Sequence, residues 1–316
     1  MSETQRSDRF TPFAWGVLAF TFMVIVFGAW VRITGSGAGC GQHWPTCHGE
    51  VIHRPQSVET VIELTHRVTS GLSMLLAVAL LVWGMVRFER GHPARRGVAL
   101  AMLFMIFEAL LGAGLVLLEL VGRNDSISRA VMMAIHLSNT CLLTGAMAAA
   151  AWCARPDRRP RTRWRDAGRG PWLLVAGLFA VILVSMSGAV TALGDTLYPV
   201  VEAGSVGDRL AADQGVTAHF LQRMRVVHPL LAVLVGLYLL WLSISLPGLD
   251  GHGAVRSLGN VVAGLVLAQL CAGVVNIMLS APGWMQLVHL GLATGLWVGL
   301  VLLALAALRA DAELQL

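Results

Sequence analysis

Four histidines stand inside strongly apolar stretches of this 316-residue chain: His66, His136, His228 and His289. Each occupies a similar place, near the beginning of its stretch. A single buried histidine is most simply a group that satisfies one hydrogen bond. Polar side chains in apolar segments are costly, however, and four at matching places favour a shared task. Neutral imidazole is above all a ligand for metal ions, so metal chemistry is the first expectation.

The composition excludes an ordinary soluble protein. Hydrophobic residues make up 56% of the chain and charged residues 13%, whereas soluble domains are about one-quarter charged. All 23 basic residues are arginine, and most form short runs between apolar stretches. This distribution is typical of a multispanning membrane protein. The arginine-rich segment 155–169 is interpreted as a cytoplasmic linker near anionic membrane lipid, and no nucleic-acid partner is expected.

Eight segments are long and apolar enough to cross a bilayer, which takes about 20 residues of helix. Backbone groups inside lipid must satisfy one another, so these segments are predicted to be helices. The expected spans are 12–31, 64–86, 97–118, 129–152, 171–193, 225–246, 257–279 and 284–307.

The arginines also predict the orientation. They precede the first span, follow the second, fourth and last spans, and are sparser in the alternate loops, of which 194–223 carries four acidic residues. The positive-inside rule therefore puts both termini in the cytoplasm of a cell-membrane protein. The four histidines then lie in the extracytoplasmic leaflet, because all four spans that hold them run from outside to inside.

The second half of the chain repeats the first. The matching pairs are Gly28 and Gly188, His66 and His228, Glu108 and Gln269, and His136 and His289. Each half has four spans, an even number, so both enter the membrane in the same direction. The predicted fold is an all-α membrane protein of two four-helix bundles related by a pseudo-twofold axis. The expected domains are 1–154 and 171–316, joined by a basic linker at 155–170.

Two imidazoles that face each other across a helix bundle can ligate a haem iron from both sides. Pairing within each half joins His66 with His136 and His228 with His289, which predicts two haem sites. Zinc is the alternative, but no third and fourth ligands lie near within each half. Four arginines at the outer boundary are candidates for binding haem propionates, although interfacial snorkelling also explains arginines there: Arg32, Arg67, Arg223 and Arg225.

The two halves differ beside their histidines. Glu63 precedes His66 by three residues and shares its helix face, whereas the equivalent residue in the second half is Arg225. Oxidation of a substrate carbon needs proton acceptance or cation stabilisation, so Glu63 is the catalytic candidate. The alternative is an interfacial pair between Glu63 and Arg67. Glu108, in the middle of the third span, is expected to form a packing hydrogen bond or to serve a proton path.

Two cysteines lie in the first outer loop, in the segment GCGQHWPTCHGE. Cys40 and Cys47 face an oxidising compartment, which favours a disulfide. The interleaved His43 and His48 leave a metal site open as an alternative. The remaining cysteines lie in or at the ends of spans and are expected to pack as small apolar groups.

These motifs together make the whole chain similar to the haem A synthase family. The resemblance rests on GAWVRITGSG after the first span, the cysteine loop, ELTHRV, AIHLSN, RVVHP and LVHLGLAT. It implies a membrane oxidoreductase that converts haem O to haem A by oxidising a ring methyl to a formyl group. It also implies that Glu63 is catalytic and that the loop cysteines are redox-active or structural. Glu108 departs from the pattern, since an amide is expected there.

The resemblance further implies which haem each half holds. One haem b is expected on His228 and His289, and the substrate haem on His66 and His136. Haem O is then the substrate, with haem O synthase and a membrane or quinol-linked electron donor as candidate partners. The competing interpretation is a di-haem b-type electron-transfer protein. A transmembrane electron path, however, would place its haems in opposite leaflets, whereas all four ligands here lie at one depth.

Overall fold

The computed structural model describes residues 9–160, 169–200, 205–250 and 253–314. Eight long apolar helices in these ranges can each cross a membrane by length and composition. They are α1 (Phe10–Ile33), α2 (Val58–Arg87), α3 (Pro93–Leu117), α4 (Ile127–Cys153), α5 (Arg169–Leu197), α7 (Phe220–Asp250), α8 (Gly253–Met278) and α9 (Gly283–Leu314). The described chain has no β-strand, only an isolated bridge between Cys47 and Glu50. The predicted all-α membrane fold with eight spans is confirmed.

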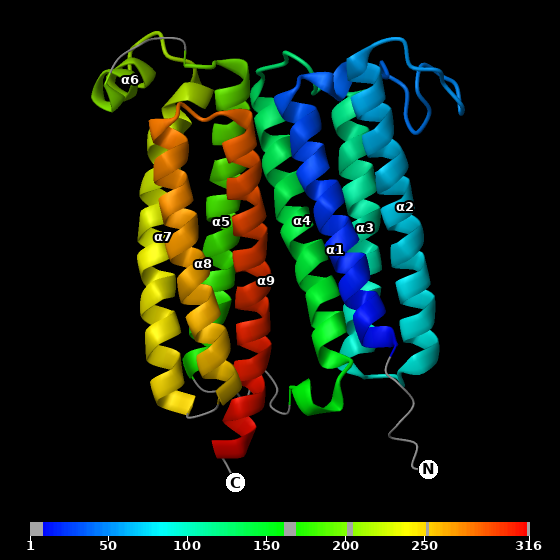
Figure 1. Ribbon diagram of the computed structural model, residues 1–316, viewed down its shortest axis with the longest axis vertical. Helices are drawn as coiled ribbons and strands as arrows, with labels where there is room; N and C mark the ends of the chain where they lie inside the picture. Colours follow the sequence, from blue (N-terminus) through cyan, green and yellow to red (C-terminus); the bar gives the residue numbers. More distant parts are fainter. Residues whose placement is uncertain (1–8, 161–168, 201–204, 251–252, 315–316) are drawn as a thin grey trace.

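The eight helices stand side by side in two groups of four (Figure 1). Helices α1, α2, α3 and α4 pack in a closed cycle, and so do α5, α7, α8 and α9. The groups meet where α4 lies against α5 and α9, and where α1 lies against α9. The axis that should relate the two groups stays a prediction. Part of the predicted linker, 161–168, lies outside the described residues.

Local chemistry explains several helix ends. Ser57 accepts a hydrogen bond from the amide of Thr60 at the start of α2, and Ser126 does the same for Arg129 at the start of α4. Such caps satisfy amides that have no partner within the helix. At α3 the capping group is the His92 imidazole. Because of its cap, α2 begins six residues before the expected apolar span.

Small residues allow close packing between and within the two groups. Trp297 on α9 lies against Gly145 on α4 and donates to the carbonyl of Cys141, 2.6 Å away. A side chain at Gly97 would lie 2.9 Å from the backbone of Ala150, so α3 and α4 approach closely there. In lipid, where apolar side chains gain little by leaving the solvent, such close contact is what holds helices together.

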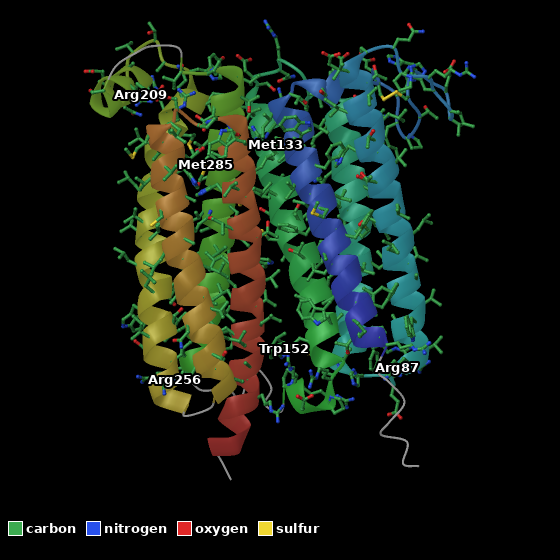
Figure 2. All side chains as sticks on the ribbon, in the orientation of Figure 1. Arg87, Met133, Trp152, Arg209, Arg256 and Met285 are labelled. Atoms are coloured by element: carbon green, nitrogen blue, oxygen red, sulfur yellow. A yellow bond between two sulfur atoms is a disulfide. The ribbon has the colours of Figure 1, made fainter. Side chains whose placement is uncertain are left out.

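The two ends of the helix array differ. The start of α1, the end of α9, Arg87, Trp152 and Arg256 lie at one end (Figures 1 and 2). The loop with the Cys40–Cys47 disulfide and the short helix α6 (Val206–Asp213) lie at the other. Helix α6 was not expected from hydropathy. A capping box of Ser205 and Asp208 begins it, with each side chain bonded to the other residue's amide.

Candidate functional site

Glycines on the first helix of each group make room for the histidines of the next. A Cβ added at Gly28 would lie 2.9 Å from Cε1 of His66, and one at Gly188 would lie 3.0 Å from Cε1 of His228. These contacts are tighter than packing allows, so a larger residue on either helix would displace the imidazole. The two glycine–histidine pairs occupy the positions that the sequence repeat matches.

The C-terminal group brings His228 and His289 together. Their ring centroids lie 6.5 Å apart, with an angle of 88° between the planes. Two metal–imidazole bonds of about 2 Å each, together with the ring radii, put the centroids of opposed ligands about 6 Å apart. Ser187 lies 2.9 Å from Nδ1 of His228, which leaves Nε2 for a metal. The donor pair and its spacing therefore fit a bis-histidine haem.

The N-terminal group offers a comparable pair. Nδ1 is buried without a hydrogen-bond partner in both His66 and His136, and the two imidazoles are within electrostatic range of each other. Buried polar atoms in native proteins are normally satisfied, so unpartnered ring nitrogens on two helices at opposite corners of the cycle are consistent with a bound group between them. The ring centroid of Phe27 lies 5.9 Å from that of His66, so an aromatic ring packs near this histidine.

Glu63 is buried, with 3% of its surface exposed. Oε2 accepts a hydrogen bond from the amide of Cys40 at 2.7 Å, and Oε1 accepts from Nε of Arg67 at 3.1 Å. Arg67 also donates to the carbonyls of His43 and Thr46. The pair that the sequence left as an alternative role is therefore present. It fixes the carboxylate one turn from His66 and attaches the disulfide loop to α2.

The residue in the second half that corresponds to Glu63 is Arg225, and two aspartates neutralise its positive charge. Arg225 lies 2.7 Å from Asp195 and 2.9 Å from Asp213, and it also donates to the carbonyl of Tyr198. Sequence reasoning did not pair these residues, because Asp213 belongs to α6, an element it did not expect. The C-terminal histidines consequently have no carboxylate in the place that Glu63 occupies beside His66.

Glu108 on α3 lies near His136 on α4. Asn139 and Thr140 each donate a hydrogen bond of 2.6 Å to its carboxylate, and Oε2 is 3.7 Å from Nδ1 of His136. In the other group, Nε2 of Gln269 lies 3.1 Å from Nε2 of His289. Both groups thus place a polar side chain of the third helix beside the histidine of the fourth, and only the first places an acid there.

The other two predicted arginines have different surroundings. Arg32 reaches from α1 into the second group, where it donates to the Ala192 carbonyl at 2.5 Å, to Gln286 at 2.9 Å and to the Thr196 hydroxyl. Arg223 makes a single long contact of 3.5 Å to the Gly215 carbonyl. Propionate binding by these arginines stays a prediction. The contact of Arg32 across the two groups had no signal in the sequence.

A further hydrogen bond joins the two helix groups. The Tyr198 hydroxyl at the end of α5 donates to Asp125 in the α3–α4 loop, 2.5 Å away. This hydrogen bond lowers the pKa of Asp125 and raises the pKa of Tyr198. The neighbouring His219 and Arg129 lower the pKa of Asp125 further, by smaller amounts.

Fold and site together define a multi-pass α-helical membrane protein with a pair of partly buried histidines in each of two helix groups. The chain belongs to the family described as cytochrome oxidase assembly protein, which matches residues 11–301.

Individual relatives carry two different names. A Thermus thermophilus protein named protoheme IX farnesyltransferase is 47% identical over 311 residues, 98% of this chain and 50% of that protein. The heme A synthase of Halalkalibacterium halodurans is 31% identical over 236 residues, 72% of this chain and 74% of that protein. The heme A synthase of Exiguobacterium sibiricum is 42% identical over 120 residues, 38% of each chain. The chain thus spans about half the length of the Thermus relative.

Proposed function

We propose that this protein is a haem A synthase, which oxidises a ring methyl of haem O to a formyl group. Membership of the cytochrome oxidase assembly protein family supports this proposal, as do relatives named heme A synthase. In the proposal, His66 and His136 hold the substrate haem. His228 and His289 hold one resident haem b, which supplies redox chemistry when bound.

The observation that carries the proposal is the difference between the two histidine pairs. Three residues before His66 stands the buried carboxylate of Glu63, whereas three residues before His228 stands Arg225. At the equivalent place Arg225 is neutralised by Asp195 and Asp213. An electron-transfer site needs no acid or base, whereas the oxidation of a carbon does. The asymmetry therefore favours substrate on one side and a resident cofactor on the other.

The residues around Glu63 would prepare it for this role. Arg67 and the Cys40 amide bond its two oxygens, so the side chain is held in one orientation. A carboxylate preorganised in a site with little water stabilises developing positive charge without reorganising during the reaction. The same oxygen atoms can accept a proton that the substrate carbon releases.

The proposal also places the protein in the cell. Arg87 and Arg256 lie at the end of the helices where α1 begins and α9 ends (Figure 2). The disulfide lies at the opposite end. We assign the arginine end to the cytoplasm by the positive-inside rule and the disulfide end to the oxidising side. The haem sites then lie toward the extracytoplasmic face, within reach of a membrane or quinol-linked electron donor and of haem O synthase.

One experiment distinguishes the activities under consideration. The chain is expressed in a cell that has haem O synthase but no haem A synthase, and the extracted haems are identified by mass. Haem A in these cells, and its absence with an empty vector, is the expected result. Unchanged haem O with two bound b-type haems would instead identify an electron-transfer protein. Haem O formed in a host without haem O synthase would identify a farnesyltransferase, as the Thermus relative is named.

A further inference from the structure

The loop between α1 and α2 gathers four side chains of the kinds that bind zinc. One ligand atom from each of Cys47, His48 and His53 lies within 4.8 Å of the other two. Cys40 is covalently bonded to Cys47, so its sulfur lies at the same place. None of these four side chains belongs to the histidine pairs, and only the backbone amide of Cys40 contacts Glu63. The cluster therefore needs an explanation of its own.

The loop backbone holds this cluster in place. The amide of His48 donates to the carbonyl of Cys40 at 3.1 Å. Cys47 and Glu50 exchange two backbone hydrogen bonds, of 3.1 and 2.9 Å. Both cysteines are buried, and the rings of His48 and His53 lie 4.9 Å apart between centroids. The positions of the four side chains thus depend on the folded loop as well as on the disulfide.

Hydrogen bonds also set which nitrogen each imidazole can offer. Nε2 of His48 lies 2.9 Å from the Gly39 carbonyl, which can only accept, so this nitrogen carries the proton and Nδ1 keeps a lone pair. Nδ1 of His53 lies 2.8 Å from the Glu50 carboxylate, which leaves Nε2. A carboxylate or carbonyl on the far ring nitrogen is the usual support of a metal-binding histidine.

We propose that reduction of the Cys40–Cys47 disulfide turns this loop into a Zn²⁺ site with two thiolates and two imidazoles. While the disulfide is intact its sulfurs are poor ligands, and two imidazoles remain. Reduction supplies a complete tetrahedral set. Zinc bond lengths put tetrahedral ligand atoms about 3.3–3.8 Å apart. The ligand atoms of Cys47, His48 and His53 therefore have to approach one another by about 1.5 Å at most. The two sulfurs, no longer bonded to each other, have to move apart.

Converting the disulfide into a pair of thiols needs one further reactant, a dithiol. A dithiol reductant transfers two electrons and two protons to the Cys40–Cys47 bond, and it becomes a disulfide itself. Zn²⁺ then displaces the two thiol protons as it binds. The zinc site would take over from the disulfide in holding the loop. The Cys40 amide would thereby remain in position for Glu63, to which it donates.

The test compares the oxidised and reduced forms of the same purified full-length protein. One sample is treated with a phosphine reductant and desalted without oxygen, the other is left oxidised, and both are incubated with zinc sulfate and desalted again. The reduced protein should retain one more zinc per chain. Its X-ray absorption should show two sulfur ligands at about 2.3 Å and two nitrogen ligands. Zinc bound elsewhere, by the paired histidines of the helices or by the free cysteines, contributes to both samples and cancels.

Variants locate the site without touching the proposed catalytic machinery. His53→Ala should abolish the difference between the reduced and oxidised samples. Glu50→Gln should weaken the extra zinc by about 10–100-fold, as loss of a supporting carboxylate does. Cys271→Ser removes an exposed thiol on α8 and should change nothing. Equal zinc in both forms of the wild-type protein, or an undiminished difference in His53→Ala, would overturn the proposal.

Discussion

The carboxylate of Glu63 accepts a hydrogen bond from the backbone amide of Cys40, 2.7 Å away. This contact joins the helix that carries His66 to the disulfide loop. Arg67 reinforces it by donating to Glu63 and to two carbonyls of the same loop. Glu63 therefore holds structure together in addition to its proposed catalytic role. A substitution at this position has to be tested in a way that separates the two.

Glu63→Gln should lower the rate of haem A formation by about 10²–10⁴-fold, the usual loss when a positioned acid–base group is removed. The amide oxygen can still accept from Cys40, so the loop and the C-terminal haem should be retained. The measurement is haem A formed per haem b in the purified variant.

Glu59→Gln is the matched control for Glu63→Gln, since it removes an exposed carboxylate one turn earlier on α2. It should leave turnover unchanged. If Glu63→Gln lowered haem content but kept turnover per haem b, Glu63 would be structural and its catalytic assignment would be wrong.

His228→Ala should remove the haem b spectrum while leaving the N-terminal site able to bind haem O. Loss of one axial ligand leaves His289 unopposed at the iron. Reduced-minus-oxidised spectra of the purified variant measure the loss. His92→Ala, which changes a histidine at the cap of α3, should keep the full spectrum. An unaltered bis-histidine signal in His228→Ala would contradict the pairing with His289.

Glu108→Gln should alter the haem on His136 and spare the haem on His289. The carboxylate lies near Nδ1 of His136 and can make that imidazole a more basic ligand, which stabilises ferric iron. Removing the charge should raise the reduction potential of the N-terminal haem and weaken its binding by about 10–100-fold. The reverse change, Gln269→Glu, should lower the potential of the C-terminal haem. Equal potentials in wild type and Glu108→Gln would leave Glu108 with a packing role alone.

The contact between Asp125 and Tyr198 should depend on pH at both extremes. Its carboxylate contribution is present above the unfolded pKa of Asp125, near 4, and is lost as the pH falls through the lowered folded pKa. Its tyrosine contribution is present below about pH 10 and is lost as the pH rises through the raised pKa of Tyr198. The side chains of Asp125 and Tyr198 thus hold the two helix groups together at neutral pH.

A background of Tyr238→Phe leaves Tyr198 as the one tyrosine in the chain, so ultraviolet absorbance reports its ionisation alone. Asp125→Asn in this background should return the pKa of Tyr198 toward its ordinary value. His219 and Arg129 also face Asp125 and remain in place in both proteins. A tyrosine titration that Asp125→Asn does not alter would show that the hydrogen bond is absent.

Thiol counting tests the disulfide directly. Denatured but unreduced protein should take up three alkylating groups, on Cys141, Cys153 and Cys271. Reduction should raise the number to five, because it frees Cys40 and Cys47. Five groups before reduction, in protein exported under oxidising conditions, would mean that the disulfide does not form.

Hydropathy predicted the membrane helices well because the bilayer imposes both length and apolarity on them. The start of α2 was placed at 64 and lies at Val58, since the cap at Ser57 depends on a polar side chain that hydropathy does not register. Helix α6 was missed for a similar reason. Its Ser205–Asp208 capping box is a sequence signal that could have identified it.

The site was predictable where it depended on position along one helix, and unpredictable where it depended on packing. The spacing of Glu63 and His66, and the pairing of Glu63 with Arg67, follow from helical periodicity. The hydrogen bond from Cys40 to Glu63 depends on how the loop folds back over α2. The surroundings of Arg32 depend on how the two helix groups meet. Neither relation is local in the sequence.

Arg32 binds the carbonyl of Ala192, and these residues occupy the same position in the two repeated halves. Two equivalent positions contact each other when both lie close to a twofold axis that relates the two halves. In a symmetric dimer of identical four-helix chains, the same arginine would face its own copy, and like charges at such a distance repel. A single chain can carry a different residue at each of the two positions. One can then supply a cation and the other an uncharged acceptor, which a symmetrical dimer could not have combined at one contact.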